Sequence, residues 1–122
     1  LQKTVEYSKT RKQFGTVIGT FQALQHRMAD MFIECQLARS IVVMAAMKLD
    51  SSASQREKTK AVSAAKSRVG KAIRSVSQEA VQIHGGIGVT NELDVGHYFK
   101  RATALEIMFG NTDYHVERFA SL

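Results

Sequence analysis

The chain has 122 residues, 44% hydrophobic and 23% charged, which indicates one soluble globular domain and argues against a disordered tail. No apolar run approaches the roughly 18–20 residues needed to cross a bilayer, so a membrane span is excluded. The formal net charge is +6, from 17 Lys and Arg against 11 Asp and Glu, which makes a polyanionic partner one hypothesis to weigh.

The first half of the chain predicts a helix end, a loop and a long helix. Leu1–Thr10 has no start methionine and no helix cap, so it reads as the last turns of a helix, and we expect a piece of a longer chain. Arg11–Gly19 contains two glycines and predicts a loop that ends at Thr20, an N-cap candidate. Apolar residues then recur at helical spacing, which predicts one long amphipathic helix with an apolar face made of Phe21, Leu24, Met28, Met31, Phe32, Cys35, Ala38, Ile41, Val42, Ala45 and Leu49.

The second half predicts three further helices separated by polar or glycine-containing breaks. The expected helices cover about Arg56–Ile83, Asp94–Met108 and Tyr114–Leu122. The breaks are Asp50–Ser54, the glycines at 85, 86 and 88, and Gly110–Asp113, which has N-cap chemistry. Strand alternation and proline are both absent from the sequence, so the predicted fold is all-α, an antiparallel up-down four-helix bundle.

The basic residues gather in one segment. Lys48–Arg74 contains eight Lys and Arg and two Asp and Glu, and eight minus two equals the whole net charge of +6. Such a stretch can follow a phosphate backbone or an anionic membrane, or it can be the solvated face of a helix. No aromatic residue lies within it, so nucleic-acid bases would have nothing to stack on. The basic segment alone is weak evidence for nucleic acid.

One loop carries residue types that suit a phosphate. In Arg11-Lys-Gln-Phe-Gly15 the guanidinium is a planar bidentate donor, and the helix that follows offers free N–H groups. Phe14 offers a flat wall for an aromatic ring. The alternative is that Arg11 forms a surface salt bridge and Phe14 fills the core.

A second loop, Gln82-Ile-His-Gly-Gly86, ends a long helix with two adjacent glycines. A helix stop explains only Gly85, so Gly86 indicates a close approach of the backbone to a ligand or to another subunit. A purely structural helix end is the alternative, and His84 beside the glycines is interpreted as a structural residue of that end.

Metal and nucleophile chemistry find little support. The spacing of the four histidines, at positions 26, 84, 97 and 115, does not build a zinc site. Cys35 is expected on the apolar face of the long helix, as a buried small hydrophobe and not as a nucleophile. No pair of carboxylates has a spacing that indicates acid–base work.

Taken in order, these loops resemble the acyl-CoA dehydrogenase family, and the match covers nearly the whole chain as the C-terminal helical domain. Each motif alone is loose, whereas their order and spacing together are specific. The motifs are Arg11-Lys-Gln-Phe-Gly15, Phe21-Gln22, Met28-Ala-Asp-Met31, Ala38-Arg39, Ala64-Ala-Lys66, Ala80-Val-Gln-Ile-His-Gly-Gly-Ile-Gly88 and Lys100-Arg-Ala102.

The resemblance implies a flavoprotein built from an N-terminal helical domain, a middle β-domain and this bundle. Such enzymes use FAD to desaturate acyl-CoA thioesters: a base removes the α-proton, a hydride leaves Cβ for the flavin, and electrons pass to an electron-transferring flavoprotein. The family also implies a homo- or hetero-oligomer with FAD at a subunit interface. Its expected location is the bacterial cytoplasm or the mitochondrial matrix.

By analogy with the family, two loops meet the FAD of the adjacent subunit. Arg11 is expected to hold the diphosphate, Phe14 to pack beside the cofactor, and Gln22 to add a polar contact. The adenosine–diphosphate portion is expected to meet Gln82 and Gly86, with Gly85 shaping the turn. This arrangement agrees with the physics, because an anionic diphosphate requires a bidentate cation and backbone N–H groups.

The last loop is expected to meet the FAD of its own subunit, through Asn111 and Asp113. Many family members place a catalytic Glu directly before the glycine of this loop, whereas this sequence has Phe109, and a phenyl ring cannot accept a proton. The catalytic residue is therefore unknown: it is expected upstream of Leu1 or on a paired, related chain. The sequence of this ending resembles the small subunits of heteromeric pimeloyl-CoA-type or steroid-side-chain-type dehydrogenases.

Two hypotheses from other classes stay open. One is a basic helical module that binds nucleic acid or an anionic membrane through Lys48–Arg74. The other is a structural bundle whose flavin site has decayed, which agrees with Phe109.

Overall fold

A computed structural model describes residues 1–90 and 94–122 of the chain. The described part contains five α-helices, two short 3-10 helices and one pair of two-residue strands. In chain order these are α1 (Gln2–Thr10), β1 (Lys12–Gln13), β2 (Thr16–Val17), η1 (Ile18–Thr20), α2 (Gln22–Asp50), α3 (Gln55–His84), η2 (Gly85–Val89), α4 (Val95–Ile107) and α5 (Thr112–Ser121).

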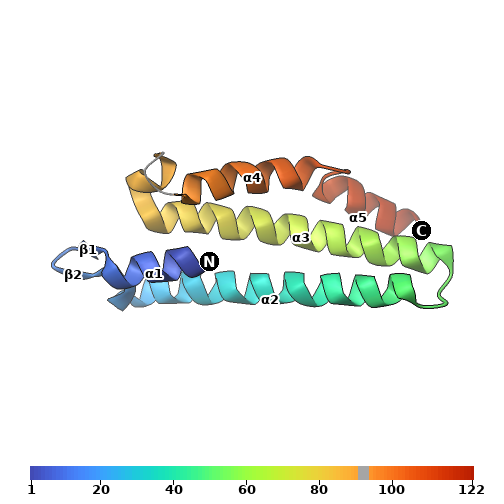
Figure 1. Cartoon of the computed structure of the whole chain (residues 1–122), viewed down its shortest axis with the longest axis horizontal. Helices are drawn as coiled ribbons and strands as arrows, with labels where there is room; N and C mark the ends of the chain where they lie inside the picture. The colour runs from blue at the N-terminus through green and yellow to red at the C-terminus, as the bar shows by residue number, and fades with distance from the viewer. Residues whose placement is uncertain (91–93) are drawn as a thin grey trace.

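The long helices α2 and α3 run antiparallel and form the spine of the molecule (Figure 1). α1 lies beside one end of this pair, and α4 and α5 follow each other along α3. α3 starts in a capping box, in which the Ser54 side chain accepts from the Glu57 N–H and the Glu57 carboxylate accepts from the Ser54 N–H. The predicted all-α, up-down bundle is confirmed, with the fourth position shared by α4 and α5.

The core is narrow and made largely of small residues. One buried cluster joins Ile18, Met31, Ala80, Ile83 and Val95, and a second joins Ala45, Ala61 and Ala65. The predicted apolar face of α2 is only partly covered, because Phe32 and Val42 remain 53% and 50% exposed. The prediction that Cys35 is fully buried is also wrong, since this residue is partly exposed. α3 packs along α2 but leaves Phe32 and Val42 uncovered.

The start of α2 differs from the prediction. Thr20 is not its N-cap: it ends η1, and its hydroxyl donates to the Val17 carbonyl at 2.6 Å. The N-cap residue is Phe21, which contributes no side-chain cap. The preceding loop also contains the antiparallel pair β1–β2, with Lys12 opposite Val17, where the sequence predicted no strand. Strands of two residues are too short to show alternation.

Within the described ranges, no helix combines the length and the hydropathy needed to cross a membrane.

Candidate functional site

The first candidate loop is closed by its own backbone and leaves the Arg11 side chain exposed. The Arg11 N–H donates to the Tyr7 carbonyl at 2.9 Å, and the Arg11 carbonyl accepts from Ile18 at 2.9 Å. The Arg11 side chain is exposed and forms neither an ion pair nor a side-chain hydrogen bond with the residues that the structure describes. The alternative of a surface salt bridge at Arg11 is therefore not observed.

The tip of this loop presents an aromatic ring. Phe14 is 91% exposed, so it does not fill the core. Its ring lies edge to face with the Phe21 ring, with the two ring centroids 6.1 Å apart. Its backbone has φ 55° and is followed by Gly15 at 79°, the pair of positive values typical of a type I′ hairpin turn. A left-handed backbone costs a non-glycine residue roughly 1–2 kcal/mol. The turn therefore holds an exposed phenyl ring at an energetic cost.

The second candidate loop, at the end of α3, contains one glycine that the fold requires and one that it does not. Gly85 has φ 66°, and its N–H donates to the Gln82 and Val81 carbonyls, so it is the helix stop. Gly86 is exposed, and a Cβ added to it would meet no atom within 4 Å. Nothing in the described chain requires glycine at position 86, which favours the interpretation that something outside the chain approaches there.

The structure brings these two loops to the same end of the bundle (Figure 1). The Tyr7 ring of α1 stacks on His84, the last residue of α3, with ring centroids 4.3 Å apart and an interplanar angle of 26°. Gln22 and Gln82 are exposed near the two loops. The exposed residues Arg11, Phe14, Gln22, Gln82, Gly85 and Gly86 all belong to the segments at this end of the bundle, here called the two-loop end.

The third candidate loop lies elsewhere. Between α4 and α5, Phe109 has φ 61° and is 87% exposed, and the Asn111 side-chain oxygen accepts from the Tyr114 N–H at 2.9 Å as the N-cap of α5. This loop packs beside Gly70 of α3. Gly70 and His84, at the end of α3, are fourteen helical steps apart, on the order of 21 Å along the helix axis. The loop with Asn111 and the exposed Asp113 is therefore separate from the two-loop end.

Two buried polar residues position this third loop, and sequence reasoning did not single out either for that role. The Glu106 carboxylate accepts from the Thr112 N–H at 3.1 Å and pairs with Arg74 at 3.4 Å. The Thr112 N–H and then the positive charge of Arg74 lower the pKa of Glu106. His115 donates from Nε2 to the Phe109 carbonyl at 2.9 Å, and its Nδ1 forms a hydrogen bond with the Ser63 hydroxyl at 3.3 Å.

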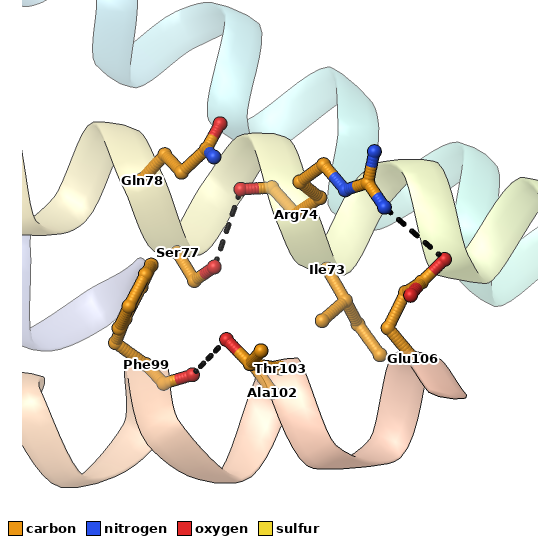
Figure 2. A pocket seen from close by; sticks show the side chains of 8 residues that line it. All are labelled: Ile73, Arg74, Ser77, Gln78, Phe99, Ala102, Thr103 and Glu106. Atoms are coloured by element: carbon orange, nitrogen blue, oxygen red, sulfur yellow. Dashed lines mark hydrogen bonds and ion pairs between the residues drawn. The ribbon is translucent and has the colours of Figure 1, made fainter. Parts of the chain in front are cut away.

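A small pocket of about 160 Å³ lies between α3 and α4. Its two charged side chains, Arg74 and Glu106, neutralise each other, and its hydroxyls donate to backbone carbonyls within their own helices (Figure 2). The lining therefore offers no activated nucleophile. It consists of Ile73, Arg74, Ser77, Gln78, Phe99, Ala102, Thr103 and Glu106.

Most cations of the basic segment, Lys48–Arg74, form contacts between α3 and the neighbouring helices. Arg68 pairs with Glu34 at 2.6 Å, and Lys66 donates to the carbonyls of Leu105 and Glu106 at 3.1 and 2.9 Å. Further contacts are Lys48–Glu57, Arg74–Glu106, Arg56 to the Leu122 carbonyl, and Lys60 over the Phe119 ring. Six of the eight cations are thus engaged, which weakens the hypothesis of a polyanion-binding face.

Within residues 1–90 and 94–122, no three His, Cys, Asp or Glu side chains come together as a metal site.

Comparison with known proteins gives a consistent result. Residues 1–121 match the family model described as acyl-CoA dehydrogenase, C-terminal domain. The chain is 47% identical over 102 residues to acyl-CoA dehydrogenase IpdE2 of Mycolicibacterium smegmatis, covering 84% of this chain and 30% of that protein.

The chain also matches solved structures closely in fold. The ChsE4–ChsE5 complex from Mycobacterium tuberculosis matches with a TM-score of 0.90 and 31% identity, covering 98% of this chain and 32% of that one. Butyryl-CoA dehydrogenase from Megasphaera elsdenii matches with a TM-score of 0.90 and 31% identity, covering 98% of this chain and 30% of that one. The chain spans about a third of the length of these proteins.

Proposed function

Because the chain belongs to the acyl-CoA dehydrogenase family, we propose that it is the FAD-binding and oligomerisation domain of an enzyme that desaturates an acyl-CoA thioester between its α and β carbons. The chain corresponds to about a third of its relatives, so the activity is that of a longer protein. FAD, when bound, supplies the acceptor for the hydride that leaves the β carbon.

The two-loop end fits the diphosphate of FAD. Arg11 is an unpaired bidentate cation within the described chain, and Gly86 leaves the backbone open to close approach. We assign both to the diphosphate of an FAD bound in the adjacent subunit. The observation that carries this assignment is that the two features lie at the same end of the bundle while neither is explained by internal packing.

The remaining residues of the two-loop end complete the proposed contact. Phe14 presents its exposed ring to the cofactor, and Gln22 and Gln82 add amide contacts from the start of α2 and the end of α3. Gly85 sets the direction of the chain through its left-handed backbone.

The third loop is assigned to the FAD of the same subunit. The Asn111 oxygen is committed to the N-cap of α5, so its amide nitrogen is the atom left to donate toward the cofactor. Asp113 stands exposed in the first turn of the same helix.

The base that removes the α-proton lies outside residues 1–122 in this proposal. Phe109 occupies the position at which the family resemblance places a catalytic Glu, and its ring carries no group that accepts a proton. We propose a segment upstream of Leu1, or a paired related subunit, as the source. A solved relative is a complex of two chains, ChsE4 and ChsE5, which supports the heteromeric form. An electron-transferring flavoprotein is the proposed electron acceptor.

Flavin content of the full-length protein tests the assignment. Arg11→Ala removes a charge-assisted bond, so its dissociation constant for FAD is expected to rise at least tenfold. Arg118→Ala, at an exposed arginine of α5, is the matched control and should keep its flavin. Wild-type FAD affinity in Arg11→Ala would reject the diphosphate role, and a full-length wild type that never binds FAD would favour the decayed, structural bundle.

A further inference from the structure

We propose that Tyr7 and His84 are positioning residues that hold the Arg11 loop and the Gly85–Gly86 loop in one fixed register, so that the two-loop end is a preformed half-site for a diphosphate. The inference rests on the proposed function and adds to it residues that touch no ligand.

Tyr7 is connected to both loops. Its carbonyl accepts the Arg11 N–H at 2.9 Å, which fixes the point where the first loop leaves α1. Its ring stacks on His84 at 4.3 Å, and its hydroxyl points at the His84 carbonyl, 3.5 Å away. That carbonyl is the last one before Gly85. Tyr7 therefore contacts both loops, Arg11 through its backbone carbonyl and His84, the residue before Gly85, through its side chain.

His84 is held firmly enough to serve as the fixed side of this contact. It is buried, and its Nδ1 donates to the Ala80 carbonyl at 2.7 Å, which sets the orientation of the ring. The chain then folds back onto it, since a Cβ at Gly88 would lie 2.9 Å from the His84 Cβ. Because the His84 ring has a fixed orientation, stacking on it also fixes the orientation of the Tyr7 ring relative to the end of α3.

The Arg11 loop needs such an external support. A hairpin of two-residue strands is not stable by itself. The elements on either side of the hairpin, α1 and η1, pack closely on each other, because a Cβ at Gly19 of η1 would lie 2.8 Å from the Ser8 carbonyl oxygen. Both ends of the hairpin are therefore held at α1, and the Tyr7–His84 stack connects this end of α1 to α3.

The expected effect follows from the worth of one stacked aromatic pair. Such a pair corresponds to roughly a two- to tenfold change in an equilibrium constant. When the stack is lost, part of the binding free energy of FAD must be used to bring the two loops together. FAD affinity should fall by that factor, although neither side chain contacts the cofactor.

The test uses the flavin-free full-length protein titrated with FAD, together with its thermal unfolding midpoint. Tyr7→Leu is expected to raise the dissociation constant roughly three- to tenfold, and Tyr7→Phe, which keeps the ring, to stay within about twofold of wild type. His84→Asn keeps a donor for the Ala80 carbonyl but loses the ring, so it should match Tyr7→Leu. Tyr98→Leu, at an exposed tyrosine of α4, is the control.

The combined variant distinguishes a link from two separate contacts. If the residues act as a pair, Tyr7→Leu with His84→Asn binds FAD no more weakly than the worse single variant. Multiplicative losses would overturn the link, as would wild-type affinity in both single variants while Arg11→Ala loses FAD. If Tyr7→Leu does not fold, the FAD affinities of His84→Asn and Tyr7→Phe decide, since only His84→Asn is expected to bind FAD more weakly than wild type. Wild-type affinity in Arg11→Ala would instead reject the diphosphate role of Arg11 on which this inference rests, and a full-length wild type that never binds FAD would refute the proposed function.

Discussion

Replacing the buried Glu106 should release the loop between α4 and α5. Its carboxylate holds the Thr112 N–H at 3.1 Å, and the Glu106 side chain is only 11% exposed. Glu106→Ala leaves this N–H without its acceptor in a buried place, whereas Glu106→Gln keeps a neutral acceptor of the same length.

The magnitude follows from the two contacts that are lost. A hydrogen bond to a charged group contributes about 1.5–3 kcal/mol. The Arg74 side chain is 63% exposed, so its ion pair adds at most about 1 kcal/mol. Glu106→Ala should therefore destabilise the local fold by about 2–3 kcal/mol, and Glu106→Gln by about 1 kcal/mol.

Acid should reveal the same interaction. The Thr112 N–H, and then the positive charge of Arg74, lower the pKa of Glu106 in the folded protein. A lowered pKa gives stability that is present above the unfolded glutamate value of about 4.3 and is lost as the pH falls through the folded value. Wild type should thus lose more stability on acidification below about pH 4.3 than Glu106→Gln does.

Amide hydrogen exchange of the full-length protein measures this locally. A loss of about 2 kcal/mol should speed exchange in the segment 109–116 by about 30-fold at neutral pH. Glu117→Ala, at an exposed glutamate of α5, is the control. Unchanged exchange of this segment in Glu106→Ala would refute the reasoning.

Three further predictions concern packing and charge. Gly70→Ala should lower stability by about 1–3 kcal/mol, because its Cβ would lie 2.3 Å from a hydroxyl oxygen of α5; an unchanged unfolding midpoint would contradict this. Gly85→Ala should lower the free energy of unfolding by about 1–2 kcal/mol, because the φ of Gly85 is 66°. Gly86→Ala should leave the thermal unfolding midpoint unchanged and weaken FAD binding. Equal losses of the unfolding midpoint in the two variants would contradict this distinction. Glu34→Gln should lower the free energy of unfolding, measured with urea, by about 1 kcal/mol at neutral pH. Because Arg68 lowers the pKa of Glu34, the difference from wild type should become smaller in acid. A difference that persists in acid would exclude the charge of Glu34 as its cause.

The helices could be predicted from the sequence because their signals are local. Gly85 stops α3 through its positive φ, and the Asn111 side chain caps α5, as glycine and asparagine at such positions predict. The errors arise where a local pattern has two solutions. Thr20 has the chemistry of an N-cap but closes a 3-10 turn, and α2 is apolar on several sides, so periodicity alone does not tell which side is covered.

For the candidate site, the sequence indicates only the chemistry of single residues. An arginine near a glycine turn and a second glycine after the helix stop are visible in the sequence. The long-range contacts near the loops are not visible there: Tyr7 meets His84 across 77 residues, and Ser63 meets His115, beside the third loop, across 52. No local pattern encodes a pairing at that separation, so these residues become visible only when the chain is folded.

Phe14 has one more consequence, for how such a protein can change. Its ring is 91% exposed, so exchanging it subtracts nothing from the core, and an asparagine or glycine there would relieve the backbone. Mutation can therefore change the side chain at this tip while the packing beneath it stays intact. The loop is a place where descendants of one gene can diverge in sequence without first acquiring compensating stability.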